Sequence, residues 1–392
     1  MSSDDGPQGV SETTGAAVLF VSAVVAVLWA NSPWHASYES LWHVATSVSV
    51  HSWSLHLDLR HVVDDGLMVV FFFAAGLEIK HELVDGDLRN PRTAALPAFA
   101  ALGGMVVPAG IFVAFTAGSG LTRGWGIPMA TDIAFALGVV ALFGTRLPSA
   151  LRLFLLTLAI VDDIGAIIVI AVFYSGDVQV GPLAGAVALL VVMVSMRRLG
   201  VTRVGAYLAV GVAVWLCTFE SGIHATIAGV AMGLLTPAPV AAKLQRQLLP
   251  LTTFVVVPLF ALANAGVRID VDSLGSHGPR TVLLAVVAGL VVGKIVGVTA
   301  FAWLAVRLGL GHLPAELSWA HVVGVAAVAG IGFTVSLFVA DLAFVHSAEL
   351  DAAAKTGVMV ASVIAALLGG ALLWRSARSG DPDPLPDATP ST

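Results

Sequence analysis

The chain has 392 residues, of which 58% are hydrophobic and only 11% are charged, and its formal net charge is −6. Soluble domains carry about 25% charged residues, so the composition predicts that most of this chain lies in lipid. The negative charge gives no indication of a nucleic-acid partner. A single cysteine, Cys217, excludes a disulfide framework and a cysteine-ligated metal site.

About twelve segments are apolar over roughly 20 residues, which is the length that a helix needs to cross a bilayer. Their apolar residues do not follow the one-sided period of an amphipathic soluble helix. The sequence therefore predicts an all-α polytopic membrane protein with one transmembrane domain over residues 13–376. The predicted spans begin near Gly15, Asp64, Thr93, Leu121, Pro148, Pro182, Val204, Gly222, Leu249, Arg280, Leu317 and Ala353.

The two ends of the chain are predicted to be disordered tails, over residues 1–12 and 377–392. The first has acidic but no basic residues, which argues against a cleavable signal peptide. Basic residues favour the cytoplasmic side. With the N-terminus inside, thirteen lysines and arginines face the cytoplasm, five, including Lys355, lie outside, and Lys294 stays within the membrane. Both termini are therefore predicted to be cytoplasmic.

An external segment at residues 45–60 has the pattern of a β-hairpin. Apolar residues alternate with polar ones from Trp53 to Arg60, and the period of two indicates a strand with one wet face. Val48 and Val50, which precede His51-Ser52, suggest the partner strand. Because a lone hairpin is marginally stable in water, we expect it to pair across a subunit interface; a simple external cap is the alternative.

Two predicted spans are interrupted. In the fourth, Pro128 removes a helix hydrogen bond just before Thr131-Asp132; in the eleventh, two glycines precede Thr334 in Gly330–Thr334. Broken spans at matching positions of two halves are typical of a transporter's binding site. Helix ends that meet in the membrane carry partial charges, and Asp132 would neutralise the N-terminal ones. Two harmless kinks are the alternative.

Three further charges fall in apolar spans, namely Asp162, Asp163 and Lys294. Each would cost roughly 2.5–3.5 kcal/mol facing lipid, so we expect all of them, with Asp132, to share an interior cavity. Glycines at positions 289, 293 and 297 would let another helix approach Lys294 closely. Adjacent helical residues point about 100° apart, so one aspartate can pair with the lysine while the other faces an ion pathway. The residues alone leave open which one does so, and a purely structural ion pair is the alternative.

Five motifs of this chain, in order between about residues 14 and 375, resemble the NhaA-type bacterial sodium/proton antiporter family. They are the segments 71–80 (FFFAAGLEIK), 131–138 (TDIAFALG), 160–168 (IVDDIGAII), 258–266 (PLFALANAG) and 330–334 (GIGFT). The resemblance implies two inverted repeats, crossed discontinuous helices at spans four and eleven, and a dimer formed through the external hairpin. Because this family is itself among the transporters known to have such broken spans, the crossed helices are implied by the resemblance.

The resemblance also implies roles for the buried residues. Asp163 would be the principal ion ligand and proton carrier, and Asp162 would be its partner, bonded to Lys294 in one state. Asp132 would compensate the helix ends and Thr131 would offer an oxygen. The implied sodium ligands are thus Asp163, Asp162 and Thr131, with no cofactor.

A cytoplasmic funnel that responds to pH would involve Glu78, Glu82, His81 and His224. For His224, a structural hydrogen bond between helices is the alternative. The chain departs from the family pattern at His81, where another basic residue is usual, and in residues 242–250, which lack the usual acidic residue and histidine. We therefore expect a shifted or flatter pH profile.

The activity that follows is electrogenic export of sodium or lithium in exchange for protons, by alternating access, in a bacterial inner membrane. This is secondary transport and not an enzymatic reaction. A sodium-coupled symporter or a cation channel of related architecture is the alternative. An intramembrane aspartyl protease fits badly, because its two aspartates must come from separate helices that face one water.

Overall fold

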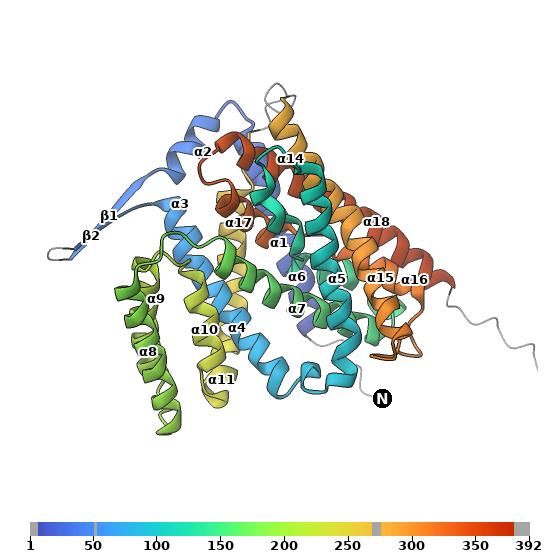
Figure 1. Ribbon diagram of the computed structural model, residues 1–392, viewed down its shortest axis with the longest axis horizontal. Coiled ribbons are helices and arrows are strands. Elements are labelled where there is room, and N and C mark those ends of the chain that lie inside the picture. The colour runs from blue at the N-terminus through green and yellow to red at the C-terminus, as the bar shows by residue number, and fades with distance from the viewer. Residues whose placement is uncertain (1–6, 51–52, 269–275, 380–392) are drawn as a thin grey trace, which may run out of the picture.

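Helices make up nearly all of the computed structural model, which describes residues 7–50, 53–268 and 276–379 (Figure 1). The first half of the chain contains α1 (Pro7–Ala30), α2 (His35–Trp42), β1 (Ala45–Val50), β2 (Trp53–Asp58), α3 (Leu59–His61), η1 (Val62–Leu67), α4 (Met68–Val84), η2 (Asp87–Arg89), α5 (Pro91–Thr116), η3 (Thr122–Met129), α6 (Ile133–Ala141), η4 (Gly144–Arg146), α7 (Ser149–Phe173) and α8 (Val180–Arg198). The second half contains α9 (Val204–Glu220), α10 (Thr226–Leu235), α11 (Ala238–Leu251), η5 (Thr252–Val256), α12 (Val257–Asn264), α14 (His277–Ala288), η6 (Gly289–Gly293), α15 (Lys294–Arg307), α16 (Trp319–Val328), α17 (Phe333–Ala343) and α18 (Ala348–Ser379). Of the η segments, η1, η5 and η6 are π-helical and the others are 3₁₀-helical.

Eight helical stretches of the described residues are long and apolar enough to cross a membrane, and the bent pair α16–α17 is a ninth. Two further apolar helices, α9 and α10, are shorter. They are separated by a turn at residues 221–225, where Gly222 has φ +79°. The chain is therefore a multi-pass helical membrane protein.

The predicted tails differ from the structure at their inner boundaries. Helix α1 begins at Pro7, because proline is favourable in the first turn of a helix. Helix α18 continues to Ser379. The remaining tail residues, 1–6 and 380–392, lie outside the described residues.

The two strands of the hairpin pair antiparallel, with Ala45 opposite Asp58 and Val50 opposite Trp53. Residues 51–52, which the sequence places at the turn, lie outside the described part of the chain. The prediction that this strand continues to Arg60 is wrong. The Asp58 carboxylate accepts a hydrogen bond from the backbone N–H of His61 at 2.8 Å, so Asp58 caps a helix that starts at Leu59.

Both predicted breaks are present. Segment η3 ends at Met129, and Ala130 and Asp132 are extended before α6 begins at Ile133. Helices α16 and α17 are separated by residues 329–332 and bend by 48°. Proline and glycine explain the breaks, because Pro128 has no N–H to donate and the glycines weaken helix propagation.

The close helix approach predicted from the glycines near Lys294 is confirmed. A Cβ atom added to Gly297 would lie 2.1 Å from the carbonyl oxygen of Gly103 on α5, and one added to Gly293 would lie 2.8 Å from Cα of Pro108. Only glycine permits this backbone contact. Helix α15 is therefore held directly against α5, with Lys294 directed into protein and not into lipid.

Candidate ion-binding site

The two broken spans meet at their breaks. The backbone N–H of Asp132 donates to the carbonyl oxygen of Ile331 at 2.6 Å. On the other side of the crossing, the Ser336 hydroxyl donates to the carbonyl oxygen of Ile127 at 2.7 Å. Four helix ends therefore converge within the protein, where their unpaired backbone groups need partners.

Asp132 binds the N-terminal ends of both α6 and α17. Its Oδ1 accepts from the N–H of Phe135 at 3.0 Å, which makes Asp132 the N-cap of α6. Its Oδ2 accepts from the N–H of Thr334 at 3.1 Å and from the Thr334 hydroxyl at 2.7 Å. One buried carboxylate thus faces two partial positive charges.

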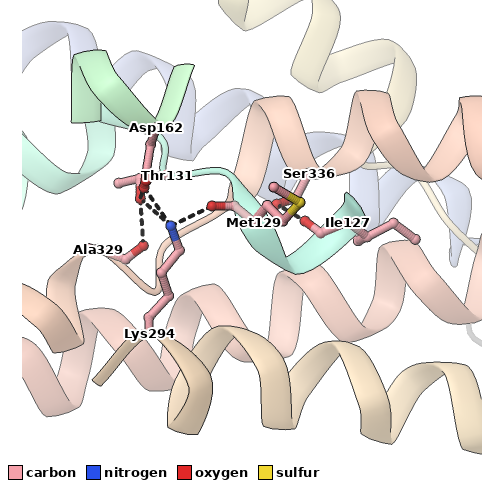
Figure 2. Close-up of polar contacts among 7 residues, drawn as sticks. All are labelled: Ile127, Met129, Thr131, Asp162, Lys294, Ala329 and Ser336. Atoms are coloured by element: carbon pink, nitrogen blue, oxygen red, sulfur yellow. Dashed lines mark hydrogen bonds and ion pairs between the residues drawn. The ribbon is translucent and has the colours of Figure 1, made fainter. Parts of the chain in front are cut away.

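Asp162 forms a fully buried ion pair with Lys294 (Figure 2). The distance from Lys294 Nζ to Asp162 Oδ2 is 2.5 Å, and neither side chain is exposed. The same Nζ lies 2.5 Å from the carbonyl oxygen of Met129, at the C-terminal end of η3. Lys294 therefore compensates both a carboxylate and a helix C-terminus.

Thr131 connects this pair to the second broken span. Its hydroxyl oxygen accepts from Lys294 Nζ at 3.0 Å. The hydroxyl proton can go to Asp162 Oδ2, at 2.7 Å, or to the carbonyl oxygen of Ala329, at 2.9 Å, but to only one at a time. Figure 2 shows Thr131 between Asp162 and Ala329.

Asp163 differs from Asp162 in having no cationic partner among the described ion pairs. Its Oδ1 atom is buried without a hydrogen bond in the described part of the chain. The residue lines a cavity of about 410 Å³, together with Glu78, Thr131, Asp132 and Thr334. The geometry assigns the pairing that the residues alone left open: Asp162 holds Lys294, and Asp163 faces the cavity.

Three of the residues implied for the pH response do not line this cavity. His81 is exposed, and its Nδ1 lies 4.0 Å from Asp85, a weak surface contact. Glu82, half-buried one turn after Glu78, is also outside the lining. His224 Nε2 lies 2.8 Å from the carbonyl oxygen of Tyr174, a hydrogen bond that joins the turn before α10 to the end of α7.

Sequence reasoning gave no role to several residues of the site. Thr334 and Ser336 fix the crossing, and Arg152 and Gln245 line the cavity. Thr334 had a signal, since it lies two residues after Gly332 at the end of the break. Arg152 and Gln245 had none, because they lie on separate helices whose approach is a matter of tertiary packing.

A buried charged pair, an unpaired carboxylate in a cavity, and broken helices that meet beside both define the class of protein. Ionisable residues inside a membrane domain mark ion or substrate pathways, and broken helices place such sites at repeat interfaces in secondary transporters. The geometry is that of an ion-coupled membrane carrier.

Comparison with known proteins gives the family. The family described as Na+/H+ antiporter 1 matches residues 9–373, and the chain belongs to it. The chain is 49% identical over 382 residues to the Na(+)/H(+) antiporter NhaA of Acidovorax sp. (strain JS42), covering 93% of this chain and 90% of that protein. It is 44% identical to the NhaA protein of Pseudomonas putida (strain GB-1), covering 94% and 96%. The family resemblance seen in the sequence is thereby confirmed.

A solved structure shares the fold. The sodium proton antiporter MjNhaP1 from Methanocaldococcus jannaschii, at 12% identity, aligns with a TM-score of 0.53 over 94% of this chain and 96% of that one. At this identity the similarity concerns the fold alone.

The buried pair generates a stability prediction. Replacing Lys294 by Gln leaves the Asp162 carboxylate uncompensated in the interior, which costs about 3–5 kcal/mol. We expect Lys294→Gln to lower the thermal transition of the detergent-solubilised protein markedly. The double variant Asp162→Asn/Lys294→Gln should lose less than the sum of the two single variants.

Asp163→Asn is the matched control, because it changes a neighbouring carboxylate that has no ion-pair partner among the described residues. It should melt close to the parent protein. A Lys294→Gln protein that is as stable as the parent would show that the ion pair contributes nothing.

Proposed function

We propose that this chain exchanges sodium for protons, with the Asp163 carboxylate as the group that holds either one. The observation that carries the proposal is the contrast within the vicinal pair. Asp162 is neutralised by Lys294, whereas Asp163 lines the cavity and belongs to none of the ion pairs found among the described residues. Hard cations such as sodium prefer oxygen ligands. Asp163 would supply the principal ligand, with oxygens of Thr131 and Asp162 close by.

Competition between ion and proton follows from burial. A lone carboxylate in a poorly solvated place is costly while it is charged and uncompensated. Either a sodium ion or a proton removes that cost, but a protonated Asp163 is a poor sodium ligand. Binding of one therefore expels the other, and the two affinities are linked reciprocally.

The Asp162–Lys294 pair would make the exchange electrogenic. If one member of this pair also gives up a proton during the cycle, then protons outnumber sodium ions and each turnover moves net charge. The hydroxyl proton of Thr131 has two acceptors within 2.9 Å, Asp162 Oδ2 and the carbonyl oxygen of Ala329. It could move between them when the Asp162–Lys294 pair rearranges, so that neither buried oxygen would stay permanently without a hydrogen bond.

Alternating access would come from movement of the crossed spans. We propose two inverted repeats, with η3–α6 and α16–α17 as their corresponding broken spans. The eight long helices, the bent pair, α9, α10 and the continuous helix from Leu59 to Val84 would together make twelve spans. On the predicted topology both termini are cytoplasmic, the protein lies in the bacterial inner membrane, and the cavity opens inward past Arg152. Lithium would be accepted beside sodium.

The first test is replacement of the proposed carrier. In proteoliposomes with a pH-reporting dye, Asp163→Asn should abolish sodium-driven proton release, because an amide neither exchanges a proton nor compensates the ion's charge. Asp177→Asn removes an exposed carboxylate outside the cavity and should leave the release unchanged. Full exchange by Asp163→Asn would remove the assignment, whereas parent protein that carries sodium without proton release would favour a symporter or a channel.

A second test concerns pH. We expect the proton flux of this chain to rise with pH over a shifted range or less steeply than in family members that carry the usual residues at position 81 and at the start of the span at 238–264. A pH series of dye-reported flux would measure this. The matched variant His81→Arg should move the profile toward the steeper form; a steep rise in the parent chain would contradict the prediction.

A third test concerns the hairpin. Figure 1 shows β1 and β2 projecting away from the helices, and a two-stranded sheet is marginal without further packing. We propose that residues 45–60 pair with a second copy of this chain. Removing residues 47–56 should convert a dimer to a monomer in mass measurements in detergent, with the melting of the helical domain little changed. A parent protein that is monomeric would refute the pairing.

A further inference from the structure

A second buried group of charges lies at the other end of α17. Lys355 of α18, which the sequence analysis counts among the basic residues of the outer side, is only 1% exposed. Its Nζ forms an ion pair with Asp341 of α17 and another with Asp351 Oδ2 at 3.1 Å. Lys355 thus ties the broken span to α18.

The group extends to α12, to the helix from Leu59 to Val84 and to α2. The Asn264 amide donates to Asp64 Oδ1 at 2.6 Å, and the Arg60 guanidinium donates to the carbonyl oxygen of Ala263 at 3.2 Å. The Tyr38 hydroxyl lies 2.9 Å from the same carbonyl. Asp341 lies near enough to attract the Arg60 guanidinium and to repel the Asp64 carboxylate. We name the whole group the outer cluster; it comprises Tyr38, Arg60, Asp64, Asn264, Asp341, Asp351 and Lys355.

Helix α17 connects the outer cluster to the ion site. Near its start, Thr334 binds the Asp132 carboxylate. Asp341 follows two turns later, about 10 Å along the axis. Between them Leu337 and Phe338 are buried. None of the cluster residues lines the cavity that contains Asp163, so the cluster is separate from the ion site and about two turns of α17 away from the crossing.

The outer cluster is held together but is not fully satisfied. Asp341 Oδ2, Asp351 Oδ1 and Asn264 Oδ1 are buried without a hydrogen-bond partner in the described residues. Each such atom carries a desolvation cost that water would remove. Opening the cluster to water would break its ion pairs but would also hydrate these atoms and the separated charges, which offsets part of the free-energy cost of opening.

We propose that the outer cluster is the outer gate of the carrier. Its ion pair between Asp341 and Lys355 holds α17 against α18 while the cavity is open on the other side, and this pair separates when the ion leaves outward. The proposal rests on the proposed function, because it supplies the closed end that alternating access needs. Differential stabilisation of two states is what such a gate provides. Without Lys355, the carboxylates of Asp341 and Asp351 repel each other and are stabilised by hydration. The equilibrium between the closed and the open arrangement of the cluster therefore shifts toward the open one.

The test is accessibility from outside. In a Cys217→Ser background, Leu337→Cys places a thiol on α17 between Thr334 and Asp341. A membrane-impermeant maleimide added to the outer side should label it slowly in the parent and faster, by on the order of tenfold, in Lys355→Gln and Asp341→Asn. Glu349→Gln, an exposed change in the first turn of α18, is the matched control and should label at the parent rate.

A reversed pair, Asp341→Lys/Lys355→Asp, keeps one attraction across the two helices and should restore slow labelling. If the single variants fail to fold, this double variant still tests the proposed gate. Unchanged labelling in folded Lys355→Gln or Asp341→Asn, with only a lower melting temperature, would overturn the gate and leave a structural cluster.

Sodium-driven proton release, measured on the same proteins, separates the two proposals. Labelling does not require transport. If the parent exchanges ions but the labelling rate is the same in the parent and in the cluster variants, the gate alone is refuted. If the parent does not exchange sodium for protons, the proposed function is refuted, and the labelling rates still report on the gate.

Discussion

The fold depends on partners for the unpaired backbone groups at helix ends that lie inside the membrane. Where the two broken spans cross, backbone N–H groups of α6 and α17 and carbonyl groups of η3 and α16 have lost their helical partners. Water is not available to replace those partners. Asp132 accepts from the first set, Lys294 and Ser336 donate to the carbonyls of η3, and Thr131 reaches the carbonyl of Ala329. Without these groups the crossing would not be stable, and no cavity could form beside it.

This compensation determines what the vicinal aspartates can do. Lys294 must lie at the end of η3, and from there it reaches Asp162. Asp163, turned about 100° around α7, cannot share that partner and faces the cavity instead. Two adjacent residues of one type thus acquire different surroundings: Asp162 is the counter-charge of Lys294, and Asp163 lines a cavity.

Much of this arrangement could be predicted from the sequence because its signals are local. Pro128 and the glycines around Ile331 predict the two breaks. A charged residue such as Lys294 in an apolar span is predicted to lie inside the protein. The partner of Lys294 could not be predicted from the residues, since it depends on how α7, α15 and η3 approach one another. The burial of Lys355 could not be predicted either, because it follows from contacts with α17 that no local pattern contains.

The contact between Gly103 and Gly297 has one more consequence. Because their backbones touch, α5 and α15 have no room for a side chain at Gly103 or Gly297, and Lys294 lies on the helix that this contact positions. A larger residue at either glycine would push the two helices apart. The lysine ammonium would then move away from both the carbonyl oxygen of Met129 and the Asp162 carboxylate, although neither glycine touches them.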